Sequence, residues 1–134
     1  MYRKQHAELV ELVQTIAKNL DESALANGAA GDASELLTKL TGKLLVHLAA
    51  EDYALYPKMI KSSDSEAAST AKQYQDEMGG LKEAFQSYYA KWNGVEKIRA
   101  DPATFITETQ GVFKALGERV QKENTILYPL ADRL

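Results

Sequence analysis

Histidine and carboxylate side chains occur in this chain at a spacing that suits metal binding. His47 and Glu51 are four residues apart, which places both side chains on one face of a helix, one turn from each other. An imidazole nitrogen and a carboxylate oxygen can then reach the same ion. His6 lies on another stripe of apolar residues with helical spacing. Two imidazoles and one carboxylate form a donor set known for non-haem iron(II).

An internal repeat adds a second carboxylate to this set. The line from Leu44 to Pro57 recurs at residues 116–129, with every matched position offset by 72 residues. Glu123 matches Glu51, whereas Arg119 stands where the first copy has a histidine. With Glu123 the set has two nitrogens and two oxygens, which would also suit zinc or manganese. The predicted metal ligands are His6, His47, Glu51 and Glu123.

The elements that must position these ligands are helices. Apolar residues recur at spacings of three and four in four segments of roughly 20 to 30 residues, and no segment of useful length alternates with a period of two. The glycine-rich stretch 21–31 predicts a loop after a first helix over about residues 2–20. The predicted start signals of the later helices are the capping boxes Asp32-x-x-Glu35 and Ser63-x-x-Glu66 and the N-cap pair Asp101-Pro102.

Two further features constrain these helices. Pro57 and Pro129 follow the two glutamates at equal spacing and predict matched kinks or ends, because a proline ring collides with the preceding turn. The pair Gly79-Gly80 predicts a close approach between helices or a kink. We expect one all-α domain over residues 1–134. Its architecture should be an antiparallel up-down four-helix bundle built from two pseudo-symmetric helical hairpins.

The composition restricts the function classes. The net charge is -3, the basic and acidic residues are interspersed, and no polybasic run occurs, so we expect neither nucleic acid nor a membrane as a partner. The chain has no cysteine, which excludes thiolate ligands and disulfides. The first residues show no apolar signal region, so we expect a cytoplasmic protein. No nucleophile and base stand in a recognisable arrangement, and we do not expect an enzyme.

The same residues carry a resemblance to a known family. The chain resembles the hemerythrin-like, or HHE cation-binding, domains through His6, the phrase from His47 to Pro57, and its echo from Glu123 to Pro129. The resemblance covers the whole chain. It implies a four-helix bundle with a di-iron centre, held by five histidines and two carboxylates and used for oxygen binding or sensing.

The family pattern is only partly present. Three of its ligands match His6, His47 and Glu51. The histidine pair of the third helix falls on Tyr74 and Met78, and the histidine and aspartate of the fourth fall on Arg119 and Asn124. Of these four, tyrosine can ligate ferric iron, whereas methionine and arginine are poor ligands for iron. We therefore expect at most one ion, iron or alternatively zinc or manganese, and no di-iron centre.

Two functional hypotheses lead from the sequence; a third, oxygen chemistry at an open position of a two-histidine, one-carboxylate iron site, has no substrate-binding feature to support it. In the first, the reduced site binds a metal ion or a small diatomic ligand in a sensing or binding role, with Tyr74 as an outer candidate ligand. In the second, the bundle is a metal-free interaction or regulatory module, with a protein partner or a second copy of the chain. Arg119 would then pair with Glu51 and Glu123 in place of the metal, because a buried charge needs a partner. Tyr2 and Tyr74 are candidates either for hydrogen bonds to the cluster or for packing around it.

Overall fold

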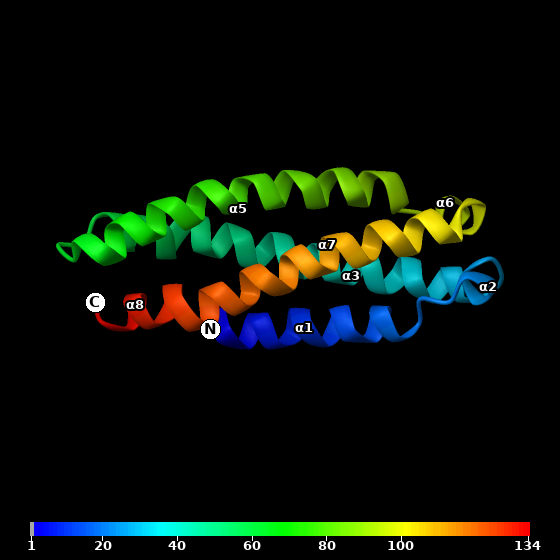
Figure 1. The fold of residues 1–134 in the computed structure, drawn as a ribbon, viewed down its shortest axis with the longest axis horizontal. Coiled ribbons are helices and arrows are strands. Elements are labelled where there is room, and N and C mark those ends of the chain that lie inside the picture. Colours follow the sequence, from blue (N-terminus) through cyan, green and yellow to red (C-terminus); the bar gives the residue numbers. More distant parts are fainter. Residues whose placement is uncertain (1) are drawn as a thin grey trace.

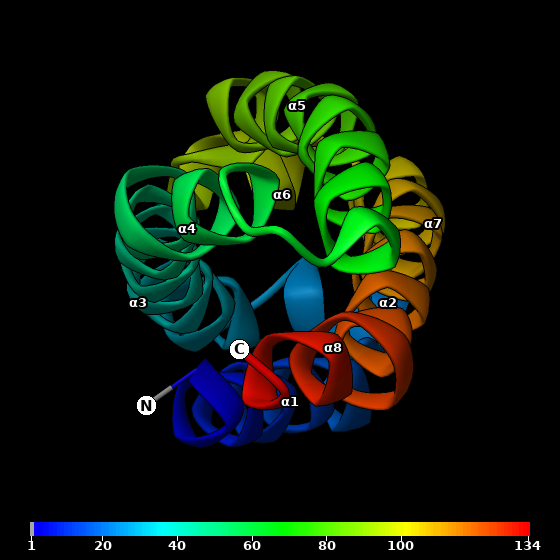
Figure 2. The ribbon, with the colours of Figure 1, turned by 90° about the vertical axis from the view of Figure 1, so that its left-hand side faces the viewer.

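Helices account for nearly all of the described chain. The computed structural model describes residues 2–134, among which no strand occurs, so the all-α expectation is confirmed. Four long helices lie alongside one another (Figure 1) and surround a common axis when the molecule is viewed end-on (Figure 2). They are α1 (Tyr2–Lys18), α3 (Ala29–Ala50), α5 (Ser65–Trp92) and α7 (Pro102–Lys122).

Shorter elements connect and extend the long helices. The expected loop after α1 contains a short helix, α2 (Glu22–Leu25), and another, α6 (Val95–Ala100), precedes α7 at the same end of the molecule (Figure 1). Beyond α3 and α7 the chain continues without leaving the helical path. The continuing segments are η1 (Glu51–Leu55) with α4 (Tyr56–Ile60), and η2 (Glu123–Leu127) with α8 (Tyr128–Asp132).

The two π-helical segments, η1 and η2, lie at matched positions of the repeat. In each, the amide of the tyrosine before the proline donates to the carbonyl five residues earlier, from Tyr56 to Glu51 and from Tyr128 to Glu123. A proline has no amide hydrogen and crowds the carbonyl four residues before it, and a wider turn relieves both problems. Matched kinks or ends were expected near the two prolines; the structure has a π turn at each, followed by more helix.

Helix starts follow side-chain capping, with two corrections to the expected positions. Asp101 caps α7 through the Thr104 amide, with proline at the first helical position as predicted. The cap of α5 is Asp64, not Ser63; its carboxylate accepts from two backbone amides, each at 3.1 Å. The capping box at Asp32 is wrong, because α3 already begins at Ala29. Asp32 lies in its first turn, where a negative charge favours the helix dipole.

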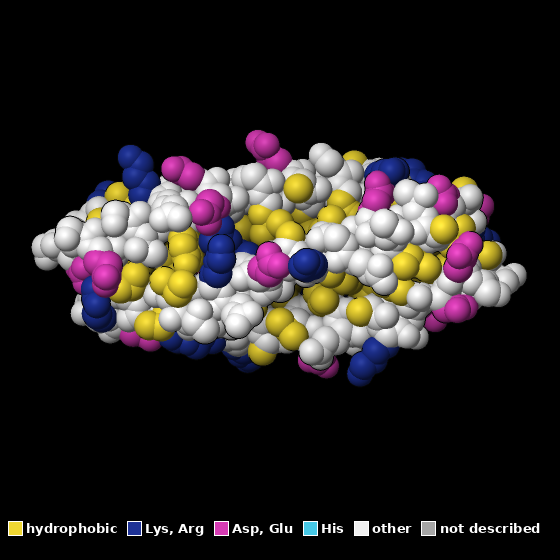
Figure 3. Space-filling model, in the orientation of Figure 1, with side chains coloured by type: hydrophobic (Ala, Val, Ile, Leu, Met, Phe, Trp, Pro, Cys, Tyr) yellow, Lys and Arg dark blue, Asp and Glu magenta, His cyan; other side chains and the backbone are white. Residues whose placement is uncertain are grey.

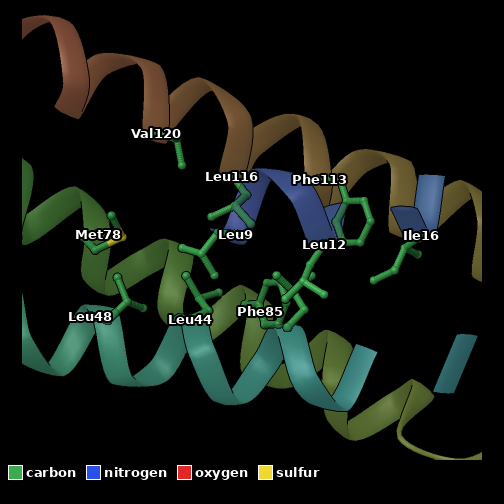
Figure 4. Close-up of a cluster of buried hydrophobic side chains, with 11 residues drawn as sticks. Leu9, Leu12, Ile16, Leu44, Leu48, Met78, Phe85, Phe113, Leu116 and Val120 are labelled. Atoms are coloured by element: carbon green, nitrogen blue, oxygen red, sulfur yellow. The ribbon is translucent and has the colours of Figure 1, made fainter. Parts of the chain in front are cut away.

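Apolar side chains from the long helices fill the middle of the molecule. Figure 4 shows Leu9 and Leu12 of α1, Leu44 of α3 and Leu116 of α7 pointing toward one another, beside Met78 and Phe85 of α5. Met78, Phe85, Tyr88 and Trp92 are all buried, as expected of core residues.

In residues 2–134, neither the glycine pair of α5 nor the face in Figure 3 shows a specialised feature. A Cβ added at Gly79 or Gly80 would have no neighbour within 4 Å, so the expected close helix approach is wrong there. On the face in Figure 3, basic and acidic side chains are interspersed, without a basic patch. Among the described residues, no helix combines the length and the apolar character needed to span a membrane.

Candidate metal centre

The four residues expected as ligands meet inside the bundle. His6 comes from α1 and His47 from α3, while Glu51 and Glu123 are the first residues of the two π segments. One possible ligand atom from each lies within 4.8 Å of all the others. None of the four residues is more than 2% exposed. Burying two carboxylates together is costly unless a positive charge balances them, so the cluster requires a cation or protons.

The outer nitrogen of each histidine is fixed by an amide oxygen. His6 Nδ1 lies 2.9 Å from Asn124 Oδ1, and His47 Nδ1 lies 2.6 Å from Gln5 Oε1. An oxygen acceptor at Nδ1 holds the proton on that nitrogen, which leaves Nε2 of the neutral ring with a free lone pair. Metal-binding histidines are commonly oriented by such a hydrogen bond on the outer nitrogen.

The inner atoms form a concentration of lone pairs. The two Nε2 atoms of His6 and His47 are 2.9 Å apart. Glu123 Oε1 lies 3.1 Å from the His6 Nε2, and Glu51 Oε1 lies 3.1 Å from the His47 Nε2. Glu51 Oε1 is buried and has no hydrogen-bond partner. Four acceptor atoms facing one another in this way are the arrangement that a bound cation would satisfy.

Two tyrosines complete the cluster and cross between the halves of the repeat. The Tyr56 hydroxyl donates to Glu123 Oε2 at 2.9 Å, and the Tyr128 hydroxyl donates to Glu51 Oε2 at 2.8 Å. The Tyr128 hydroxyl oxygen also lies 3.0 Å from the His6 Nε2. Each tyrosine therefore holds the glutamate of the other half, by way of the oxygen that faces away from the histidines.

Sequence reasoning missed these tyrosines, although a signal was present. The repeated Leu-Tyr-Pro marked Tyr56 and Tyr128, but a residue five positions after a glutamate lies on a different face of an α-helix. Only the π turn aligns positions i and i+5. Of the tyrosines that were considered, Tyr2 stacks on the Tyr128 ring at 5.8 Å and meets the His47 ring edge-on. Tyr74 packs in the same group of buried side chains as Tyr56 and Tyr128, and its ring lies against Arg119.

Without a cation, the pKa values of the clustered groups shift so that a proton is retained beside the carboxylates. Burial opposes the charged form of His47, but a protonated ring can donate to Glu123 and Glu51, and these interactions outweigh burial and raise its pKa to about 9. Burial alone would raise the pKa of Glu123, yet hydrogen bonds with both histidines lower it to about 2. Burial raises the pKa of Glu51, assisted by the charge of Glu123. Burial and the two carboxylates also raise the pKa of Tyr56, as they do for Tyr128.

Arg119 does not fill the expected role. The expected pairing of Arg119 with Glu51 and Glu123 is wrong, because its NH2 group donates to Glu77 at 2.7 Å and its guanidinium lies 4.7 Å from the centre of the Tyr74 ring. The long side chain carries the charge away from the cluster toward the surface between α5 and α7. The arginine itself is only 8% exposed, and its NH1 atom is buried without a partner.

A helical bundle with a buried cluster of two histidines and two glutamates defines a candidate cation-binding domain. The chain belongs to the hemerythrin HHE cation binding domain family, which it matches over residues 1–131. Comparison with curated proteins and with solved structures gave no match.

The structure also locates the residues that depart from the family pattern. Met78 packs in the apolar core, and Tyr74 pairs with Arg119. Asn124 holds His6 from outside the cluster. The residues at these positions are therefore used for apolar packing, for the contact between Tyr74 and Arg119, and for a hydrogen bond that orients His6.

Proposed function

We propose that this chain binds one metal ion through His6, His47, Glu51 and Glu123, and that its role is binding or sensing. The observation that carries the proposal is a buried Glu51 oxygen without a hydrogen-bond partner, next to two imidazole nitrogens 2.9 Å apart. The outer sides of both rings are already held by amides. The donor set fits iron(II), zinc or manganese, and the bound ion would supply the charge that balances the two carboxylates.

The proposal includes a limit of one ion. A second ion would need ligands from the positions of Tyr74, Met78, Arg119 and Asn124. Met78 is a poor ligand for iron and Arg119 is a cation that repels one. We therefore propose a mononuclear site and no di-iron centre.

We further propose that residues 1–134 form a single domain. Its architecture is an antiparallel up-down four-helix bundle built from two pseudo-symmetric helical hairpins. In this description, α3 with η1 and α4 counts as one helix, and α7 with η2 and α8 as another. The side-by-side helices in Figures 1 and 2 and the 72-residue offset support it. An ion held by α1, α3, η1 and η2 would link three of the four helices of the bundle and leave out only α5. The stability of the bundle should therefore depend on whether the ion is bound.

Unfolding by denaturant, with chelator and with added ion, tests the proposal. An ion at about a hundred times its dissociation constant should raise the free energy of unfolding by about 2.7 kcal/mol. Glu123→Gln should abolish that increase, because it removes a charged ligand. Glu118→Gln removes the same charge from an exposed position of α7 and should leave the increase intact. Wild-type protein whose stability does not respond to iron(II), zinc or manganese would contradict the proposal.

One alternative keeps support from a specific observation. A metal-free interaction module would need another positive charge between the glutamates, and Arg119 does not supply it. A proton on His47 would do so, since the pKa of this histidine rises to about 9 in the absence of a cation. In that case chelator and metal would leave the unfolding transition unchanged, so the same experiment separates the two functions.

A further inference from the structure

The two tyrosine hydroxyls restrict what the glutamates can offer to an ion. Tyr56 occupies Oε2 of Glu123, and Tyr128 occupies Oε2 of Glu51. Each carboxylate is left with a single inner oxygen, Oε1, on the side of the histidines. Together with the Nε2 atoms of His6 and His47, the cluster therefore presents four possible ligand atoms that receive no tyrosine proton, where glutamates without these hydrogen bonds would present six.

The backbone conformation of both halves of the repeat produces this arrangement of tyrosines and glutamates. The π turn that starts at each glutamate brings the tyrosine five residues later onto the same side of its helix. The hydroxyl then reaches across to the opposite glutamate. Tyr56 and Tyr128 are 0% and 2% exposed, so water does not compete for these hydrogen bonds. Tyr2 stacks on Tyr128, and this contact helps to hold the second ring in place.

We propose that Tyr56 and Tyr128 are specificity-determining positioning residues, which limit the site to four donors and so favour zinc over manganese or iron(II). This inference rests on the proposed metal-binding function. Zinc in closed protein sites takes four nitrogen, sulfur or oxygen ligands. Manganese favours six oxygen-rich ligands, and non-haem iron(II) is typically held with further positions open. Freeing the outer oxygens would allow each glutamate to bind through both atoms, which serves the larger coordination number.

The test compares zinc and manganese affinities of wild type, Tyr56→Phe, Tyr128→Phe and the double variant by competition with a chelator. Each phenylalanine removes one hydroxyl and keeps the ring. Loss of an outer hydrogen bond should weaken zinc binding about 10- to 100-fold, whereas manganese affinity should hold or increase. The zinc-to-manganese ratio should therefore fall by about tenfold or more in each single variant. Tyr88→Phe is the matched control: this buried tyrosine bonds Thr109, far from the cluster, and its loss should leave the ratio unchanged.

Cobalt(II) gives an independent readout, because its visible bands are intense with four ligands and weak with six. Wild type loaded with cobalt(II) should show the intense bands, and the double variant should lose them. The spectrum of the wild type tests the inference even if a variant fails to fold. Because Tyr56 and Tyr128 are related by the repeat, one folded single variant is enough for the affinity test.

The outcomes separate this inference from the function on which it rests. Wild type that binds an ion with weak six-ligand cobalt bands, or variants with an unchanged zinc-to-manganese ratio, would overturn the inference and leave the metal site standing. Wild type that binds none of these ions would overturn both. If Tyr88→Phe and Tyr128→Phe lose similar stability but only Tyr128→Phe changes the zinc-to-manganese ratio, the hydroxyl of Tyr128 acts on the ion and not on the fold in general.

Discussion

At the residue scale, the cluster is an excess of acceptors. It is fixed from outside by two amide oxygens that accept from the histidines and by two tyrosine hydroxyls that donate to the glutamates. Asn124 and Gln5 orient the histidines, and Tyr56 and Tyr128 orient the glutamates. All four inner atoms are thereby left facing one another, and positive charge must come from a proton or an ion. The ligands themselves could be predicted from sequence because four-residue spacing and an apolar stripe are local properties. Their outer partners could not, because they depend on contacts between distant helices.

Asn124→Leu tests the orienting role of one of these partners. The substitution removes the acceptor of the His6 Nδ1 proton, so the ring loses its preferred tautomer and orientation. Metal affinity should fall about 10- to 100-fold. Isothermal titration of wild type and variant with zinc measures it, and Asn19→Leu, at an exposed position at the end of α1, serves as the control. Equal affinities of wild type and Asn124→Leu would show that the amide does not orient the ligand.

The pair of Arg119 and Glu77 should respond asymmetrically to substitution. Arg119 is 8% exposed and Glu77 is 41% exposed. Glu77 can therefore exchange its partner for water, whereas the buried charge of Arg119 depends on the ion pair. Arg119→Leu replaces a buried cation by an apolar group and should change stability by less than about 1 kcal/mol. Glu77→Gln leaves that cation without its anion and should cost about 1 to 3 kcal/mol. Denaturant unfolding in chelator measures both; the opposite order would mean that Arg119 has a partner inside the cluster.

At the element scale, the two π turns lie where the ligands are. The repeated proline predicted a matched kink or end of the two helices, because it lacks an amide hydrogen and its ring crowds the preceding turn. The kind of interruption was not predictable, because a kink, a helix end and a π turn all relieve the same clash. The choice matters for the site, since only the π turn places Tyr56 and Tyr128 beside the glutamates.

Pro57→Ala should show what the π turn contributes. Alanine restores an amide donor and removes the ring, so the segment can return to an ordinary α-helix. Tyr56 would then rotate away from Glu123. We expect unchanged or higher stability of the metal-free protein and a smaller stability gain on adding zinc. Thermal melts with and without the ion measure this, and Pro102→Ala, at the first helical position of α7, is the control. A full metal-induced gain in Pro57→Ala would contradict a role for the π turn.

At the scale of the whole molecule, the buried cluster can be neutralised in two ways, by a proton or by a metal ion. The hydrophobic pattern predicted the all-α class and the buried location of the ligands, because both follow from burying one stripe per helix. The direction of Arg119 was not predictable, because its long side chain can reach either the cluster or the surface. This choice decides the charge of the core, and it leaves the glutamates to be neutralised by a proton or by a metal.

The pH dependence of stability should differ between the two states. Without metal, the folded-state pKa of His47 is raised from 6.5 to about 9, so its proton stabilises the fold fully below pH 6.5. That contribution is lost progressively as the pH rises through about 9. With metal bound, the proton is displaced and this loss should disappear. Unfolding free energies between pH 6 and 10, with chelator and with zinc, measure the difference; identical profiles would contradict it.

Metal content tests the central claim most directly. The chain, purified without chelator and without metal-affinity resin and then equilibrated with a small excess of zinc, iron(II) or manganese, should retain one ion on gel filtration. The double variant Glu51→Gln/Glu123→Gln should retain none, because it removes both charged ligands. One ion per wild-type chain by elemental analysis, lost in the variant, is the result that we predict. No retained ion, or two ions per chain, would contradict the account.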